Sequence, residues 1–404
     1  MDQSTDQSSG RGLRAGRLAT FAYFALNGFL MGMWIVHIPA IEHRAGVSHA
    51  VLGWLLLMLG AGAFAGMQVV GPLTDRFGAR TVVPVSAALF SASLILPGSA
   101  TNAWTLGAAL LLVGCGNGSM DVSMNVHAVQ VERAYGRPVM SAFHATYSIG
   151  GVLATLIGAL TLSLGWSPAL TLGLAATFGS AVSVAAAPPL LRLEREQAPG
   201  AGTETEPVRT PRRIWILASL ALMLMLCEGV ANDWSALHLR DVLDASPATA
   251  AFAYGAFATA MTVGRFLADR TSARFGAMAI LRYGAAVAGI GLATAAMSPW
   301  IPLALVGWTI AGIGLSGCVP QLFSAAGHTD RAAAGANVAR VAGIGYLGVL
   351  AGPAVIGPMT RFMPLNTTFL LPVTFCVIAA CTAGVLRETS VRRLLPPANL
   401  RTSH

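Results

Sequence analysis

Long apolar segments alternate with short polar stretches along this 404-residue chain. Six segments in the first half are long enough to cross a bilayer, at about 18–41, 51–70, 81–100, 103–127, 142–164 and 167–191. Six more follow in the second half, at about 214–240, 248–268, 277–298, 301–326, 334–360 and 365–386. Because about 20 mainly apolar residues span the hydrocarbon core as a helix, the pattern predicts an all-α polytopic membrane protein with twelve transmembrane helices.

The longest hydrophilic stretch, 192–213, separates the two sets of segments and combines charged residues with Pro and Gly. It has no apolar periodicity, which is typical of a linker. We therefore expect an N-terminal six-helix bundle at 18–191, a cytoplasmic linker at 192–213 and a C-terminal six-helix bundle at 214–387. Residues 1–17 and 388–404 are polar and basic and are predicted to be cytoplasmic tails, the first without regular structure.

The composition excludes a soluble protein of this size. Hydrophobic residues make up 55% of the chain and charged residues only 10%, against about 25% charged residues in soluble domains. The net charge of +8 is spread over short loops rather than gathered in a patch, so nucleic-acid binding is not expected. The five cysteines lie in apolar segments without metal-ligand spacing, and no cofactor or metal is predicted.

The placement of the arginines predicts an orientation. With the N-terminus inside, 20 of the 25 arginines fall in inner loops and tails, three in outer loops and two inside segments. The first apolar run, 18–41, is longer than the roughly 7–15 residues of a signal-peptide core. By the positive-inside rule, we expect a multi-pass protein of the bacterial cytoplasmic (inner) membrane with both termini in the cytoplasm.

A polar stripe interrupts the fourth segment. Asn117, Asp121 and Asn125 are four residues apart, so a helix places them on one face. A carboxylate inside an apolar segment is costly and usually faces a cavity or a partner. Removal from water favours the protonated carboxyl group, so such a residue can bind and release a proton, although a structural hydrogen bond is the alternative.

A second carboxylate, Glu228, lies inside the seventh segment, and Asn232 extends the same helix face one turn later. We assign Glu228 the same expected role in proton coupling, again with a structural hydrogen bond as the alternative. Asp233 lies nearer the outer end of the segment, where it either joins this face or pairs with Arg240. Arg340 either reaches the inner surface or pairs with an anion.

Uncharged donors and acceptors also occur inside the segments, namely Asn27, His144, Tyr147, Gln321 and Asn337. A cavity lined by such side chains suits a solute that is rich in hydroxyl groups. For His144 taken alone, a packing role is the competing interpretation.

Glycines at positions 114, 116 and 118 interleave with the polar stripe. They give the fourth helix a thin face on which a neighbouring backbone can approach closely. The run 114–125 also aligns with 312–323 in the second half, at an offset of 198 residues. Such a repeat is typical of two bundles related by an axis along the membrane normal.

A glycine- and charge-rich loop joins the second and third segments. Its defining residues are Gly71, Asp75, Arg76, Gly78 and Arg80. The glycines permit a tight turn, and Asp75 can pair with an arginine or cap a helix N-terminus. We therefore predict a gate that holds the two bundles together at this end, against the simpler view that the arginines only set the topology.

The twelve segments, the central linker and the motif G-x-L-x-D-R-x-G-x-R at 71–80 resemble the major facilitator superfamily. A degenerate copy of the motif with Asp269 and Arg270 follows the eighth segment, and Arg265 is expected to join that loop cluster. The runs 116–118, 131–133, 143–151 and 228–235 resemble the branch that contains MosC- and YbjJ-like membrane proteins. The resemblance implies a transporter built from two bundles and a sugar- or cyclitol-like solute.

These features favour a secondary active transporter, coupled to protons, that moves a small polar solute by alternating access. No catalytic triad, His-rich or phosphate-cradling motif occurs in the sequence, so an enzyme is not expected. Two alternatives remain open: a proton-driven drug or metabolite efflux antiporter, and a non-transporting membrane receptor on a transporter scaffold. The expected partners are a small-molecule solute, protons and the lipid bilayer, and the protein is expected to be a monomer.

Overall fold

The computed structural model describes the chain apart from residues 1–2, 48, 192–209, 246, 331 and 388–404. The regular elements of the described residues are helices. Those of the first half are α1 (Gln3–Ala45), α2 (His49–Phe77), α3 (Ala79–Ser93), α4 (Ile95–Ser99), α5 (Ala103–Tyr135), α6 (Met140–Ser163) and α7 (Pro168–Ala185). Those of the second half are α8 (Arg212–Val242), α9 (Pro247–Phe275), α10 (Ala277–Ala296), α11 (Ile301–Leu315), α12 (Cys318–Thr329), α13 (Ala334–Met359), α14 (Leu365–Thr368), α15 (Leu370–Thr382) and the 3₁₀ turn η1 (Ala383–Leu386).

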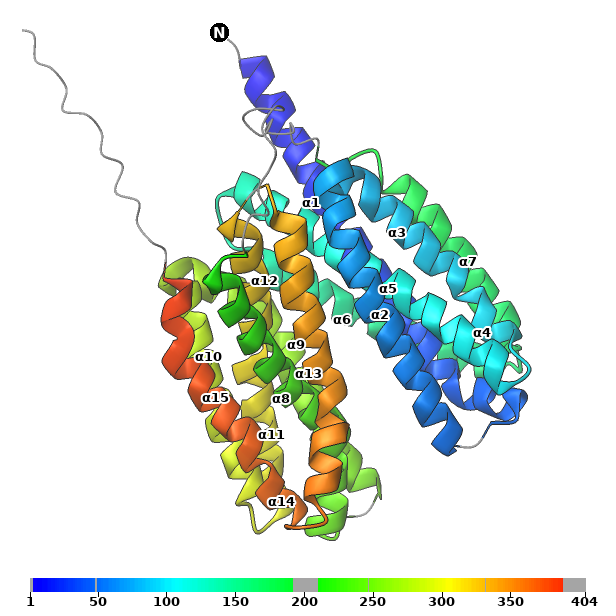
Figure 1. Cartoon of the computed structure of the whole chain (residues 1–404), viewed down its shortest axis with the longest axis vertical. Coiled ribbons are helices and arrows are strands. Elements are labelled where there is room, and N and C mark those ends of the chain that lie inside the picture. Colours follow the sequence, from blue (N-terminus) through cyan, green and yellow to red (C-terminus); the bar gives the residue numbers. More distant parts are fainter. Residues whose placement is uncertain (1–2, 48, 192–209, 246, 331, 388–404) are drawn as a thin grey trace, which may run out of the picture.

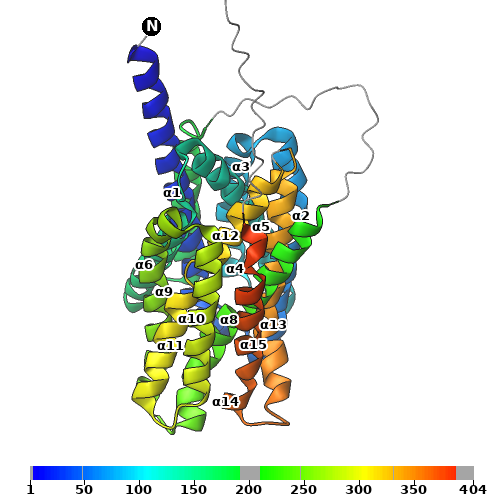
Figure 2. The same cartoon turned by 90° about the vertical axis from the view of Figure 1, so that its left-hand side faces the viewer.

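The helices form two lobes. Figure 1 shows α1–α7 in one lobe and α8–α15 in the other, and Figure 2 shows the long helices running roughly along one common direction. In the first lobe α2 packs on α5 and α1 on α6, while in the second α13 packs on α8 and α10 on α11. The lobes contact each other through α2 with α13 and through α6 with α9.

Within the described residues, 11 helical stretches are long and apolar enough to cross a membrane. The remaining long helix, α9, has 29 residues and packs against α8 and α11 in the second lobe. Its hydropathy is lower because it carries Arg265 and Asp269 among its apolar residues. With α9 included, the predicted all-α fold of twelve membrane helices is confirmed.

The helix ends differ from the prediction in a few places. α5 continues to Tyr135 and α9 to Phe275, beyond the expected ends at 127 and 268, because polar residues can extend a helix whose backbone remains hydrogen-bonded. The expectation of an irregular tail at 1–17 is wrong from Gln3 onward, where α1 begins, and no proline interrupts residues 3–17. Most of the expected linker (192–209) and the expected C-terminal tail (388–404) lie outside the described residues.

Glycines allow α5 to reach backbone contact with its neighbours. A Cβ atom on Gly114 would lie 2.0 Å from a carbonyl oxygen of α2, and one on Gly118 would lie 2.1 Å from the oxygen of Ala63. Gly116 instead faces α3, where a Cβ atom would lie 2.7 Å from a backbone atom. The predicted thin face is therefore confirmed, and it serves two neighbouring helices rather than one.

Replacing Gly118 with alanine is expected to destabilise the first lobe by about 1–3 kcal/mol, because the new methyl group meets a backbone oxygen that cannot move aside without shifting α2. Gly173→Ala is the matched control. A Cβ atom there has no neighbour within 4 Å, so its helix should gain up to about 1 kcal/mol. Thermal unfolding of the two purified variants in detergent measures the difference, and equal unfolding temperatures would contradict this packing argument.

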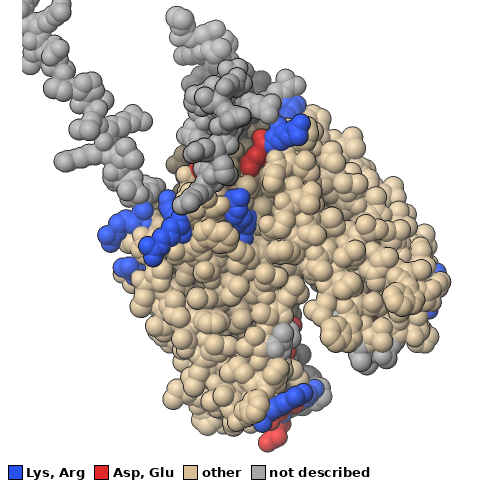
Figure 3. Space-filling view, in the orientation of Figure 1, with Lys and Arg blue, Asp and Glu red and all other residues tan. Residues whose placement is uncertain are grey.

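The two lobes meet at the end of the molecule that carries the N-terminus, here named the closed end. They diverge toward the opposite end, here named the open end, where Figure 3 shows a hollow between them. Charged side chains gather near the two ends of this face, whereas its broad middle is almost entirely uncharged. An uncharged belt of this kind suits a hydrocarbon environment.

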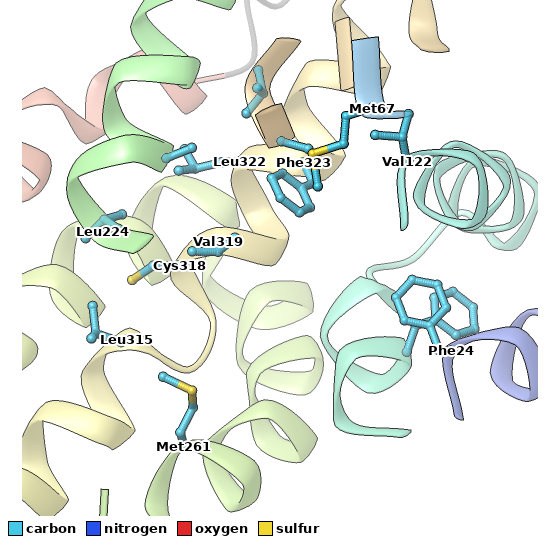
Figure 4. Close-up of a cluster of buried hydrophobic side chains, with 14 of the residues drawn as sticks. Phe24, Met67, Val122, Leu224, Met261, Leu315, Cys318, Val319, Leu322 and Phe323 are labelled. Atoms are coloured by element: carbon cyan, nitrogen blue, oxygen red, sulfur yellow. The ribbon is translucent and has the colours of Figure 1, made fainter. Parts of the chain in front are cut away.

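Buried apolar side chains also join the lobes. Phe323 of α12 points toward Met67 of α2 and Val122 of α5 (Figure 4), and none of the three is more than 3% exposed. The ring centroid of Phe323 also lies 6.0 Å from that of His144 on α6. These contacts exclude water from the lobe interface next to the polar groups described below.

Candidate functional site: polar groups between the two lobes

Asp75 lies at the closed end and caps a helix of the other lobe. Its Oδ1 accepts the backbone N–H of Gly335 at 2.6 Å, and its Oδ2 accepts that of Ala336 at 2.9 Å. Both donors belong to the first turn of α13, whose N–H groups lack partners within the helix and whose dipole favours a negative charge. Of the two predicted contacts for Asp75, an arginine or a helix N-terminus, the structure contains the second.

Close backbone approach makes this cap possible. A Cβ atom on Gly335 would lie 2.7 Å from the Asp75 Oδ1, and one on Gly71 would lie 2.6 Å from the Cβ of Ala339. A side chain at either glycine would therefore push α2 and α13 apart. The glycine at the start of the loop motif thus serves the same contact as the aspartate.

Asp269 makes the corresponding contact in the opposite direction. It accepts the backbone N–H groups of Ser141 at 2.9 Å and Ala142 at 2.6 Å, both in the first turn of α6. Its side chain is buried, with 8% of the residue exposed. Each lobe therefore contributes one aspartate that caps a helix of the other lobe, which is the symmetry expected from the sequence repeat.

The other residues of the predicted gate have surroundings that differ from those of the two aspartates. Gly78 has a φ angle of +82° between α2 and α3, a conformation that favours glycine. Arg80 donates to the carbonyl oxygen of Pro188 at 3.2 Å, within the first lobe. Arg76 and Arg270 are exposed at the closed end. The aspartates thus join the lobes, while Gly78 and Arg80 shape the first lobe itself.

Glu132 strengthens the same end, and the sequence analysis did not assign it. One oxygen accepts the N–H groups of Val139 at 3.0 Å and Met140 at 3.1 Å at the start of α6. The other oxygen accepts the hydroxyl of Ser324 on α12, in the second lobe. Glu132 is thus both a helix cap and a link between lobes.

Arg133, the next residue, was also missed as a link between lobes. It donates through Nη2 to the carbonyl oxygen of Gly327 on α12. The approach is close, because a Cβ atom on Gly327 would lie 2.7 Å from the side chain of Val129. The available signal was the run 131–133, which the sequence analysis used only for a family resemblance.

Replacing Glu132 with alanine is expected to lower the unfolding free energy by about 2–4 kcal/mol, because two backbone N–H groups and a hydroxyl lose their acceptor in a buried place. Glu132→Gln keeps an acceptor oxygen and should lose clearly less. Chemical denaturation in detergent measures both changes, with Asp241→Ala, which removes an exposed ion pair, as the control. A Glu132→Ala variant as stable as the control would rule out this structural role.

An arginine–glutamate ion pair lies further from the closed end. Arg265 Nη2 of α9 lies 3.3 Å from Glu228 Oε1 of α8, and its Nη1 donates to the hydroxyl of Ser148 on α6 at 3.1 Å. The expectation that Arg265 joins the loop cluster with Asp269 is wrong. Glu228 supplies the opposite charge that an arginine inside an apolar helix needs, and this outweighs proximity along α9.

Two residues of the polar stripe of α5, Asp121 and Asn125, form a chain of hydrogen bonds with His144. Asn125 Nδ2 donates to the backbone oxygen of Asp121 at 2.8 Å and to its Oδ1 at 3.3 Å. His144 Nε2 donates to the Asn125 Oδ1 at 3.2 Å, and its ring packs edge-on against Phe24, with centroids 5.2 Å apart. His144 therefore has both the packing contact and the polar contact that the sequence analysis set against each other.

Two tyrosines interact with the charged groups of these helices. Tyr147 of α6 interacts electrostatically with Asp121, Glu228, Arg265 and Tyr346, and Tyr346 of α13 interacts with Asp121. Helices α5, α6, α8, α9 and α13 therefore direct polar groups toward one region between the lobes, here named the central site. Tyr346 and Arg265 complete this site, and the sequence analysis assigned neither to it.

Four predicted amides besides Asn125 are buried. Asn27 and Asn117 have Oδ1 atoms without a hydrogen-bond partner among the described residues. Gln321 accepts the Ser272 hydroxyl at 3.1 Å, and Asn337 accepts from Arg340 at 3.3 Å. The first two oxygens are therefore unsatisfied inside the first lobe. The other two are used within the second lobe, where Gln321 Nε2 and Asn337 Nδ2 have no partner among the described residues.

The outer part of α8 does not extend the central site as expected. Asn232 and Asp233 are exposed. One turn after Glu228, side chains of α8 are therefore no longer buried between the helices. The alternative Asp233–Arg240 pair is not formed either, because Arg240 Nε lies 2.6 Å from Asp241 Oδ1. A neighbouring carboxylate reaches the guanidinium with less side-chain ordering than one seven residues away.

The family model of the Major Facilitator Superfamily matches residues 19–353. An uncharacterised MFS-type transporter of Yersinia pestis is 33% identical over 374 residues, which cover 92% of this chain and 96% of that protein. The chain belongs to the major facilitator superfamily. The membrane protein MosC of Rhizobium meliloti is 29% identical over 363 residues, covering 89% of this chain and 87% of MosC, which supports the predicted MosC-like branch.

Solved structures agree with this family. The crystal structure of the superfamily transporter FucP in the outward conformation matches with a TM-score of 0.77 and 15% identity, over 92% of this chain and 98% of FucP. A second crystal structure of FucP, described as the E. coli fucose:proton symporter, matches with a TM-score of 0.75 and 14% identity. At this identity the likeness establishes the fold. This superfamily member is a multi-pass membrane transporter and not an enzyme, as predicted.

Proposed function

We propose that this superfamily member is a secondary active transporter of the bacterial cytoplasmic membrane that couples protons to the movement of a small polar, sugar- or cyclitol-like solute. The observation that carries the proposal is the central site, where Asp121 and Glu228 face one region between two lobes. A carboxylate is retained inside a membrane segment at a cost that function must outweigh. Alternate exposure of these groups to the two sides of the membrane would couple proton and solute movement.

The closed end is the cytoplasmic end in this proposal, and both termini are cytoplasmic. The arginine distribution supports this orientation. With it, the structure corresponds to an outward-open state, and the likeness to FucP in the outward conformation agrees. The bundles at 18–191 and 214–387 would rock about the central site, breaking the Asp75 and Asp269 caps as the open end closes.

Hydrogen-bonding groups around the central site support a hydroxyl-rich solute. The Oδ1 atoms of Asn27 and Asn117 are buried and have no hydrogen-bond partner among the described residues. In this proposal they become accessible as the lobes move, and each then accepts a hydroxyl of the solute. Tyr147, Asn125 and His144 supply further donors and acceptors. FucP, whose printed description is a fucose:proton symporter, shares the fold and supports a sugar-like solute by analogy only.

Flux measurements on the full-length protein in proteoliposomes test the proposal. A panel of radiolabelled sugars and cyclitols is offered with an inside-alkaline pH gradient, and with no gradient as the control. We expect at least one solute to accumulate above its external concentration only with the gradient, and a protonophore to abolish the accumulation. Flux that ignores the gradient would contradict proton coupling, and binding without flux would favour the receptor alternative.

A further inference from the structure

We infer that Arg265 is the receptor for a carboxylate on the solute, so that the transported class is a small hydroxylated carboxylate that enters together with one proton. This inference rests on the proposed function and narrows its solute class. In the structure, Glu228 forms an ion pair with the Arg265 guanidinium and is its counter-ion. On loading, Glu228 takes up a proton and the solute carboxylate replaces it at the guanidinium.

The first support is that some N–H donors of the Arg265 guanidinium have no acceptor among the described residues. Its guanidinium has five N–H donors in a planar fork that matches a carboxylate with two parallel bonds. Glu228 uses only Nη2, at 3.3 Å, and Ser148 uses Nη1. Arg265 Nε is buried and has no hydrogen-bond partner among the described residues. The fork is therefore partly unsatisfied in a place where an unmade hydrogen bond is costly.

The second support is the position of the ion pair. The side chains of Arg265 and Glu228 are 14% and 24% exposed, so neither belongs to the charged surface at the ends of the lobes. Ser148 comes from the first lobe and Arg265 from the second. A ligand that binds the guanidinium therefore contacts the boundary between the lobes, where binding can favour one arrangement of the lobes over the other.

The third support is the balance of charges. Among the titratable groups of the surrounding helices, His144 and Tyr147 interact with Arg265, and Tyr147 and Tyr254 interact with Glu228. Asp121 interacts with Tyr147 and Tyr346, and Asp233 interacts with Tyr254. Arg265 is the positive charge of this set, and Glu228 is its direct partner. If Glu228 takes up a proton, the guanidinium loses its direct ion-pair partner inside an apolar segment. A solute carboxylate restores the balance, so one proton and one anion move without net charge.

Matched pairs of solutes test the inference in proteoliposomes that contain the full-length protein. The pairs are glucuronate with glucose, galacturonate with galactose, gluconate with sorbitol, and 3-hydroxybenzoate with 3-hydroxybenzyl alcohol. Each pair keeps its hydroxylated frame and differs in a carboxylate against an alcohol. We expect at least one acid to accumulate with an inside-alkaline pH gradient, its alcohol partner not to compete, and a potassium–valinomycin potential to leave the initial rate unchanged.

Substitutions of Arg265 and Glu228 test whether these two residues bind the acid and couple it to a proton. Arg265→Gln should reduce uptake of the acid at least about 30-fold, and Arg265→Lys, which keeps the charge but loses the fork, about tenfold. Arg240→Gln, in an exposed ion pair at the open end, is the control and should transport normally. Glu228→Gln should still exchange labelled for unlabelled acid but should not accumulate it. Thermal unfolding confirms that each variant is folded.

Three results would overturn the inference: no acid is transported, an acid and its alcohol are transported equally well, or folded Arg265→Gln keeps the uptake of the acid. Uptake that responds to the membrane potential would also contradict the one-proton, one-anion balance. Accumulation of a neutral sugar driven by the pH gradient would leave the proposed function intact while refuting the carboxylate. The two proposals therefore fail on different observations.

Discussion

Replacing both Asp75 and Asp269 with asparagine is expected to change the equilibrium between lobe arrangements roughly 30-fold, away from the one in which the lobes meet at the closed end. Solute transport should fall strongly. Each aspartate accepts two N–H groups at the first turn of a helix in the other lobe. Asparagine keeps one acceptor but loses the negative charge that the helix dipole favours, at a cost of about 1 kcal/mol for each cap. Two losses of about 1 kcal/mol correspond to roughly 30-fold in the equilibrium between arrangements.

The single variants show whether the two caps are independent. Because Asp75 and Asp269 act on different helices, Asp75→Asn and Asp269→Asn should each have about half the free-energy effect of the pair. Spin labels at Arg137 and Ala332, both exposed near the closed end, report the separation of the lobes. Flux in proteoliposomes reports transport, and Asp241→Asn at the open end is the control. Unchanged label distances and normal transport in the double variant would refute the gate.

Replacing Asp121 and Glu228 together, as Asp121→Asn and Glu228→Gln, is expected to abolish accumulation driven by a pH gradient, a loss of more than about tenfold in the final internal concentration. The amides keep the size of the carboxyl groups and their hydrogen bonds to Asn125 and Arg265, but they bind no transferable proton. Exchange of labelled for unlabelled solute needs no net proton movement and should persist.

The contrast between accumulation and exchange is what identifies a coupling group. A merely structural loss would lower both, whereas the proposed role predicts loss of the first alone. Each single variant then shows which carboxylate carries the proton. Accumulation that survives in the double variant would disprove the assignment of both residues, and thermal unfolding confirms that the variant protein is folded.

The helices of this protein were predictable because their signal is local. About 20 apolar residues between short polar loops define a membrane helix wherever it packs, and the observed helices contain nearly all of the predicted segments. α9 was predicted as well, as the segment at about 248–268. Its charged residues lower its hydropathy, yet the same residues provide the Asp269 cap and the Arg265 ion pair.

The central site was predictable only in part. The spacing of Asn117, Asp121 and Asn125 along one helix determines that they share a face, and the structure joins Asp121 to Asn125. Arg265 was misplaced because its position along the chain, four residues before Asp269, suggested a loop partner. Its true partner, Glu228, lies 37 residues away on another helix, and no pattern in one segment records such a contact.

The order of residues along the chain is enough to establish the class of the molecule, its twelve helices, its internal repeat and the aspartates that each half contributes to the lobe interface. These features depend on hydropathy and on spacing within single segments, which one chain displays directly. The packing of the helices in three dimensions, by contrast, brings each aspartate to the helix that it caps, lets Glu132 and Arg133 join the lobes, and places Arg265 with Glu228 and Ser148. Those contacts unite residues far apart in the chain, and they form because a buried charge must find its partner in space rather than in sequence.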